Sequence, residues 1–316
     1  MKKLIVSAAA ILALTTFSFA ADLSTESGID ITGKYLGIDI GARSSGMANA
    51  VAARSYGPEA IFGNPANTMA NPGRNAILVS HNSWLADTFQ ETAAYVRGFK
   101  DIGTFGAAIS YFNQGVIEAY KLDSLGNPVK IDDITPYALV VKANWSQLIV
   151  KEFMCGANIG YSMESIGDYS SHTLGVDLGI KYMPEEVRGL SFGLAARNIG
   201  INFDGYKLYR DLILGAGYKM YIEKEHMLNF GGDIGILYDS SFKISEELKA
   251  SIGAEYVYNK MYSLRLGYQI DRTNSDGLTG LRAGAGIVYE QFNIDYAFEP
   301  YGDMGAAHKI SLGMEF

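Results

Sequence analysis

The sequence is poor in the residues that build disulfide-rich or metal-binding proteins. It contains one cysteine, Cys155, and four histidines in 316 residues. A single cysteine cannot form an internal disulfide bond. No histidine has a metal-like partner at a short, fixed spacing. We therefore expect no metal site and no cofactor.

Basic residues are also scarce. The chain has 26 Lys and Arg against 34 Asp and Glu, so its formal net charge is −8. Nucleic acid is bound mainly through clustered basic residues, and we expect no such partner. The glycine-rich stretches 193–201 and 280–289 lack the spacing of a phosphate-binding loop. We expect no catalytic residues, with a hydrolase as a minor alternative.

Long hydrophobic runs are absent beyond the N-terminus. The first residues combine a doubly basic start, a short apolar stretch and a small-x-small site at 18–20. This pattern is typical of a secretory signal peptide cleaved after Ala20 or Ala21. We predict a signal peptide over 1–20, and an uncleaved anchor helix is the alternative. No later run approaches the roughly 18 residues of a membrane helix.

Apolar and polar residues alternate instead, as the C-terminal run "HKISLGMEF" illustrates. There Ile310, Leu312, Met314 and Phe316 fall on one face, because successive side chains of a strand point to opposite faces. The same period recurs from residue 75 onward. The 14 segments are roughly 75–83, 88–98, 102–120, 134–148, 152–163, 172–183, 188–200, 207–221, 226–238, 246–258, 260–270, 279–289, 291–299 and 307–316.

Segment length and connection length both point to a membrane barrel. Tilted strands that cross a bilayer need about nine to eleven residues, whereas strands of soluble proteins average about five or six. Short turns at 259–260 and 290–291 alternate with long loops at 271–280 and 299–307, as in bacterial outer-membrane barrels. We predict an all-β, transmembrane antiparallel barrel of about 14 strands over 75–316. We expect it in the outer membrane, in contact with lipid.

The two faces of these segments have different expected roles. The apolar face should meet lipid, and the other face should line the lumen with inward glycines and with charges of both signs that pair with each other. The last strand resembles the recognition strand of outer-membrane barrels, which ends in an aromatic residue. This resemblance implies that Phe316 is a C-terminal assembly signal for the barrel-assembly machinery.

The stretch over 21–74 breaks the alternation. It has short alanine-rich pieces, glycines and two Asn-Pro turns, and Ser44 or Ser45 could cap a helix extending to about Ala53. A barrel of this width needs its lumen filled or left as a channel. We predict that 21–74 forms an N-terminal plug, and a periplasmic tail is the alternative.

Three motifs carry a family resemblance: "GARSSGMANA" at 41–50, "AIFGNPA" at 60–66, and "HNSW" at 81–84. Together they resemble the PorV/PorQ family, which belongs with the FadL-like long-chain fatty-acid transporters. The chain departs from the family's acidic stretch between the first two motifs, where it has "ARSYGPEA". The family positions of the plug motif fall on Gly41, Arg43, Gly46, Met47, Ala50, Asn64, Pro65 and Ala66.

The resemblance implies a 14-stranded barrel with an N-terminal plug, but two functions. FadL-like members move hydrophobic compounds across the outer membrane. PorV-like members belong to type IX secretion and act on cargo proteins or secretion subunits. The shared motifs concern plug architecture, so both hypotheses stay open: transport of a hydrophobic ligand, and partnership with secretion-system proteins.

Overall fold

A computed structural model describes residues 33–202, 208–238, 244–271 and 279–316. The predicted signal peptide and residues 21–32 of the predicted plug lie outside the described residues. No helix within the described ranges is long and apolar enough to cross a membrane.

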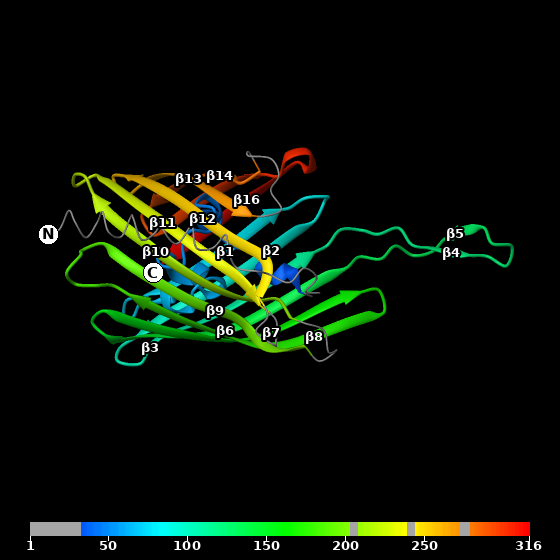
Figure 1. The fold of residues 1–316 in the computed structure, drawn as a ribbon, viewed down its shortest axis with the longest axis horizontal. Helices are drawn as coiled ribbons and strands as arrows, with labels where there is room; N and C mark the ends of the chain where they lie inside the picture. Colours follow the sequence, from blue (N-terminus) through cyan, green and yellow to red (C-terminus); the bar gives the residue numbers. More distant parts are fainter. Residues whose placement is uncertain (1–32, 203–207, 239–243, 272–278) are drawn as a thin grey trace.

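Antiparallel strands close into a 14-stranded barrel, as the sequence predicted (Figure 1). Each barrel strand pairs with the next barrel strand along the chain, with β3 beside β6, and β16 closes the ring against β1. The strands are β1 (Asn75–Ser83), β2 (Phe89–Phe99), β3 (Gly103–Asn113), β6 (Tyr137–Val150), β7 (Phe153–Ile166), β8 (Tyr169–Tyr182), β9 (Leu190–Asn202), β10 (Arg210–Tyr221), β11 (His226–Tyr238), β12 (Ile244–Tyr258), β13 (Tyr262–Asp271), β14 (Leu281–Tyr289), β15 (Phe292–Pro300) and β16 (Ala306–Glu315).

The alternation in the sequence becomes an apolar outside and a polar inside. In β16, Ile310 and Leu312 are 47% and 52% exposed, whereas Lys309 and Ser311 between them are each 1% exposed. Exposed apolar side chains on the other strands follow the same rule, including Ile252 and Leu264. The predicted assignment of the two faces of β16 is confirmed.

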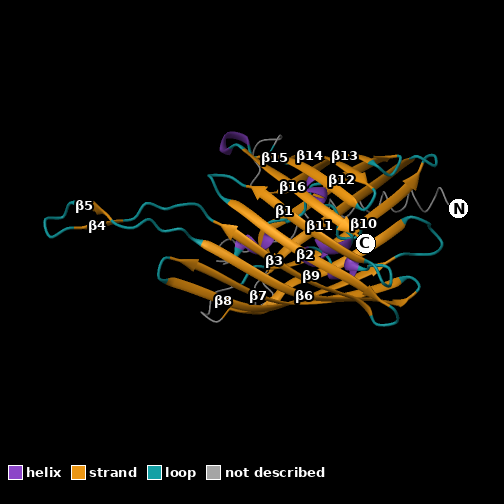
Figure 2. Ribbon diagram, turned by 180° about the vertical axis from the view of Figure 1, so that it is seen from behind, coloured by secondary structure: helices purple, strands orange, loops and turns teal. Residues whose placement is uncertain are grey.

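The two ends of the barrel differ. Tight turns and the C-terminus lie at one end, here called the turn end. Asn259 and Lys260 form one such turn with left-handed backbones (φ 51° and 56°). The opposite end, the loop end, carries a long hairpin that projects well beyond the barrel (Figure 2). The hairpin contains β4 (Tyr120–Leu122) and β5 (Pro128–Lys130).

This hairpin corrects the prediction of one strand over 102–120. Strand β3 ends at Asn113, whose side-chain oxygen accepts a hydrogen bond from the backbone of Gly115 at 2.9 Å. Gly115 has φ of +86°, which turns the chain out of the barrel ladder. Residues 120–122 therefore pair with β5 rather than with a barrel strand.

Residues 33–74, here called the N-terminal segment, lie inside the ring of strands as short helical pieces (Figures 1 and 2). The expected helix to Ala53 is wrong, because Ala48 and Asn49 adopt left-handed backbones (φ 52° and 61°) that end it early. Its N-cap is Gly41 rather than a serine. The pieces are η2 (Lys34–Gly37), α2 (Ala42–Gly46), η3 (Gly57–Phe62) and η4 (Pro65–Thr68).

A belt of inward glycines receives this segment. It crosses eight neighbouring strands, from β7 to β14, and a Cβ added at any member would come within about 3 Å of a segment atom. Glycine in a strand often marks such a close backbone approach. The glycine belt comprises Gly156, Gly179, Gly193, Gly215, Gly231, Gly253, Gly267 and Gly284.

Candidate functional site

Three residues of the first predicted motif are small or apolar because they lie in tightly packed positions. A Cβ on Gly41 would lie 2.2 Å from the carboxyl carbon of Glu59, whose Oε1 accepts from the Ser44 amide at 2.9 Å. Gly46 lies against Gly284 of the belt. Met47 is fully buried, so it belongs to the packed interior rather than to an open path.

Arg43 is the charged member of the motif, and it joins the segment to the barrel wall. Its Nε and Nη2 donate to the two carboxylate oxygens of Glu255 at 3.0 Å and 2.9 Å. Its guanidinium also lies 4.5 Å from the ring centroid of Tyr56. Burial alone would lower the pKa of Arg43, but Glu255 outweighs this and raises the pKa above its ordinary value.

The second motif, Asn64-Pro65-Ala66, docks on β7 and β8. The Asn64 amide donates to the carbonyl of Ile180 at 3.0 Å and to that of Ala52 at 2.9 Å. Its side-chain oxygen accepts from the Ala66 amide at 3.1 Å and so caps η4. The motif therefore ties the segment both to the wall and to itself.

Many charges inside the barrel form mutual pairs, as the sequence predicted for most inward positions. Lys142 pairs with Asp177 at 2.6 Å, and Arg197 makes a bidentate pair with Asp211. Among the described residues, further pairs inside the barrel are Arg265 with Glu255 and Asp295, Arg282 with Glu299, and Lys309 with Glu299.

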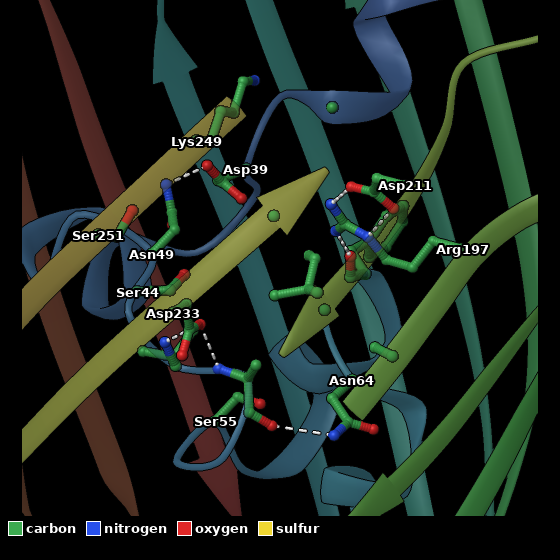
Figure 3. A pocket seen from close by; sticks show the side chains of 18 of the residues that line it. Asp39, Ser44, Asn49, Ser55, Asn64, Arg197, Asp211, Asp233, Lys249 and Ser251 are labelled. Carbon is green, nitrogen blue, oxygen red and sulfur yellow. Dashed lines mark hydrogen bonds and ion pairs between the residues drawn. The ribbon is translucent and has the colours of Figure 1, made fainter. Parts of the chain in front are cut away.

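A cavity of about 100 Å³ lies on the loop-end side of the segment, bounded by β9 to β13 (Figure 3). Asn49 donates to Asp39, and Asp233 accepts from the Val51 and Ala52 amides at 2.8 Å and 2.7 Å. Burial raises the pKa of the Asp39 carboxyl. This volume is below the roughly 300 Å³ at which ligand pockets begin, so the cavity has room only for very small polar molecules.

A larger cavity of about 340 Å³ lies on the turn-end side of the segment. Arg43, Arg54 and Tyr56 of the segment line it. Its barrel residues are Lys219, Tyr221, Met227, Asn229, Glu255, Val257, Ser263, Arg265, Val288, Asn293 and Asp295, joined by Lys224, Glu225 and Lys260 from two turns. Sequence reasoning missed this cavity, because the turn residues stand outside the alternating pattern.

Histidines do not contribute to either cavity. Each forms a cross-strand pair: Tyr161 with His172, His226 with Tyr256, and Tyr296 with His308, each at 2.7 Å, and His81 with Glu91 at 2.6 Å.

At the turn end, Phe316 pairs with Asn75 through two backbone hydrogen bonds of 2.8 Å and 2.9 Å, which close the last rung between β16 and β1.

Comparison with known proteins identifies solved structures of similar fold. No protein-family model matches the sequence, and no curated protein matches it. Solved structures do match. They share the barrel fold of this chain.

The Pseudomonas putida toluene transporter TodX is 12% identical with a TM-score of 0.56, over 87% of this chain and 96% of that one. The Ralstonia pickettii toluene transporter TbuX is 13% identical with a TM-score of 0.54, over 86% and 97%. A Pseudomonas aeruginosa FadL homologue is 12% identical with a TM-score of 0.52, over 88% and 98%. Identities this low establish the shared fold.

Proposed function

We propose that the protein is an outer-membrane channel that carries small hydrophobic compounds across that membrane. The observation that carries the proposal is the closed 14-stranded barrel, apolar outside, with a packed segment in its lumen. A closed barrel leaves no strand edge unpaired in hydrocarbon, where an unpaired backbone group costs several kcal/mol. Its FadL-like fold is shared with proteins named as toluene transporters.

In this proposal residues 33–74 act as the plug. The segment contributes residues to both cavities, and it is held by buried contacts to the wall. Passage then requires part of the segment to move. The inner wall of the barrel is strongly polar. A hydrophobic compound must therefore pass along it without breaking the buried ion pairs.

Uptake by whole cells tests the proposal. Cells without other channels for such compounds would express the full chain, and the initial uptake of labelled toluene and of a long-chain fatty acid would be compared with cells carrying an empty vector. We expect faster uptake of at least one compound. Equal rates for both compounds would refute transport of this class.

A second assay addresses the plug. A variant lacking 41–66 is expected to raise single-channel conductance in planar bilayers, because the lumen loses the residues that fill it. Since a deletion of this size can impair folding, Gly253→Ala provides a milder displacement of the same segment. Unchanged conductance in a folded deletion variant would refute the plug as gate.

A second candidate function, partnership with a secretion system, is favoured by the projecting hairpin. Leu122 and Leu125 near its tip are 71% and 85% exposed, and Val116 at its base is 66% exposed. Exposed apolar side chains grouped on one projection are typical of protein contact surfaces. Replacing Leu122 and Leu125 with serine should abolish cross-links to a secretion subunit or cargo in intact cells. Persistence of those cross-links would exclude the hairpin tip as the contact.

A further inference from the structure

The two cavities inside the barrel carry opposite charge. The loop-end cavity is lined by four carboxylates and two cations, whereas the turn-end cavity is lined by six cations and three carboxylates. This count takes each side chain in its ordinary charged form. The turn-end cavity therefore has a formal excess of three positive charges, within a chain whose net charge is −8.

Only two of the six cations are neutralised by the cavity's own carboxylates. Glu255 lies between Arg43 and Arg265, and Asp295 pairs with Arg265 at 2.7 Å. Within the described ranges, the other four form no ion pair with a carboxylate. These four cations are Arg54, Lys219, Lys224 and Lys260.

Arg54 belongs to the N-terminal segment, and its hydrogen bonding is incomplete. Its Nη2 donates to Asn229 at 2.8 Å, while its buried Nε has no partner among the described residues. Burial lowers the pKa of Arg54, and the neighbouring Arg43 lowers it further. Glu255 offsets these two effects only in part. A buried cation that is incompletely compensated is unfavourable, so an anion beside Arg54 would relieve both desolvation and repulsion.

The cavity also has room and apolar surface. Its volume of about 340 Å³ is at the lower end of the range for ligand pockets. Tyr56 lies within the barrel yet is 55% exposed, so its ring faces open space. Tyr221 is 58% exposed and lies beneath the ammonium of Lys219, at 5.1 Å from ring centroid to nitrogen. Val257 adds an aliphatic wall.

We propose that the turn-end cavity binds small dianions, namely compounds with two carboxylates or one phosphate on an apolar or aromatic body. A doubly charged ligand would offset most of the three-charge excess. Lys224 and Lys260, which lie in turns, would attract the anion at the mouth. Arg54 would bind it through its guanidinium group. The proposal concerns binding, and it holds whether or not the barrel transports toluene or fatty acids.

Calorimetry on the purified full chain in detergent tests the proposal, with phthalate, phenyl phosphate, benzoate and benzyl alcohol as probes. We expect at least one dianion to bind about tenfold more tightly than benzoate, and benzyl alcohol to give no binding heat. Preference for phthalate or for phenyl phosphate would identify the carboxylate or the phosphate as the group recognised. Failure of both dianions to bind, or equal affinity for benzoate, would overturn the proposal.

Variants locate the site. The double variant Lys219→Gln/Lys260→Gln should weaken dianion binding about tenfold and flatten its salt dependence. Arg54→Lys keeps the charge but loses the planar guanidinium fork, and it should also weaken binding. Lys100→Gln is the control, since Lys100 is exposed in the turn between β2 and β3 and does not line the cavity.

An equal loss of dianion affinity in Lys100→Gln would indicate binding by general surface charge rather than by this cavity, and it would overturn the proposed site. Unchanged binding in the double variant would do the same. The uptake assay above contains no dianion, so its outcome is independent of this one.

Discussion

Arg43 and Glu255 are 212 residues apart in the chain, and they form a buried bidentate ion pair with donor–acceptor distances of 3.0 Å and 2.9 Å. The pair joins the N-terminal segment to β12. Both side chains are almost completely buried, at 6% and 4% exposure. Breaking such a buried pair costs several kcal/mol, because a buried charge loses a partner that water does not replace.

Replacement of Arg43 should therefore loosen the segment. In Arg43→Met, Glu255 keeps Arg265 at 2.8 Å but loses its second partner, and we expect a loss of about 3 kcal/mol in unfolding free energy. Protease cleavage within 33–74 should increase as well. Lys130→Met is the control, since the Lys130–Glu118 pair is solvent-exposed and should change stability by less than about 1 kcal/mol. If residues 33–74 of Arg43→Met resisted the protease as well as those of the wild type, the prediction would be contradicted.

One methyl group in the glycine belt should also displace the segment. A Cβ on Gly253 would lie 2.4 Å from the carbonyl oxygen of Met47, which is backbone and has to shift. We expect Gly253→Ala to cost about 1–3 kcal/mol, as overpacking does in cores. Gly232→Ala on the neighbouring strand is the matched control, because its nearest atom is Ser251 O at 3.8 Å. Equal melting temperatures for the two variants would contradict the role of the belt.

The pH dependence of stability should contain a contribution from Asp39. Burial raises the pKa of Asp39 in the folded state, so the folded protein holds this proton at pH values where the unfolded chain has released it. Stability must then fall as pH rises through that interval. Asp39→Asn removes the group, so the loss of melting temperature between acidic and neutral pH should be smaller in the variant. Parallel curves for the two proteins would exclude this contribution.

Much of the barrel could be predicted from the sequence, because a strand with one side in an apolar medium and the other in a polar lumen must alternate at every residue. The run from Ile310 to Phe316 has this signal, and so did thirteen other segments. Length then separated membrane strands from soluble ones. The short helix could not be predicted, because the left-handed backbones at Ala48 and Asn49 depend on packing against the wall.

The candidate site could be predicted only in part. Inward glycines and paired charges followed from the polar face of the strands. The partner of each residue could not follow, because Arg43 meets Glu255 only after the barrel has closed. The excess charge of the turn-end cavity also depends on Lys224 and Lys260, which belong to turns and have no periodic signal. The projecting hairpin was missed because its strands span three residues each.

The C-terminal aromatic residue allows assembly and stability to be separated. Phe316 closes the ring against Asn75 through backbone hydrogen bonds, and the Asn75 side chain donates to the Phe316 carbonyl oxygen at 3.2 Å. Deleting Phe316 removes these bonds and the aromatic end of the last strand, whereas Phe316→Ala keeps the backbone bonds and removes the ring alone. If the ring is read during assembly, both variants should lower the amount of heat-modifiable barrel in the outer membrane several-fold. Phe316→Tyr should assemble normally because the aromatic ring persists.

Stability is measured separately, on protein refolded from denaturant. The deletion should show a lower melting temperature than Phe316→Ala, since only the deletion opens the β1–β16 rung. Normal assembly of Phe316→Ala in cells would leave the residue a role in closing the barrel and none as a signal.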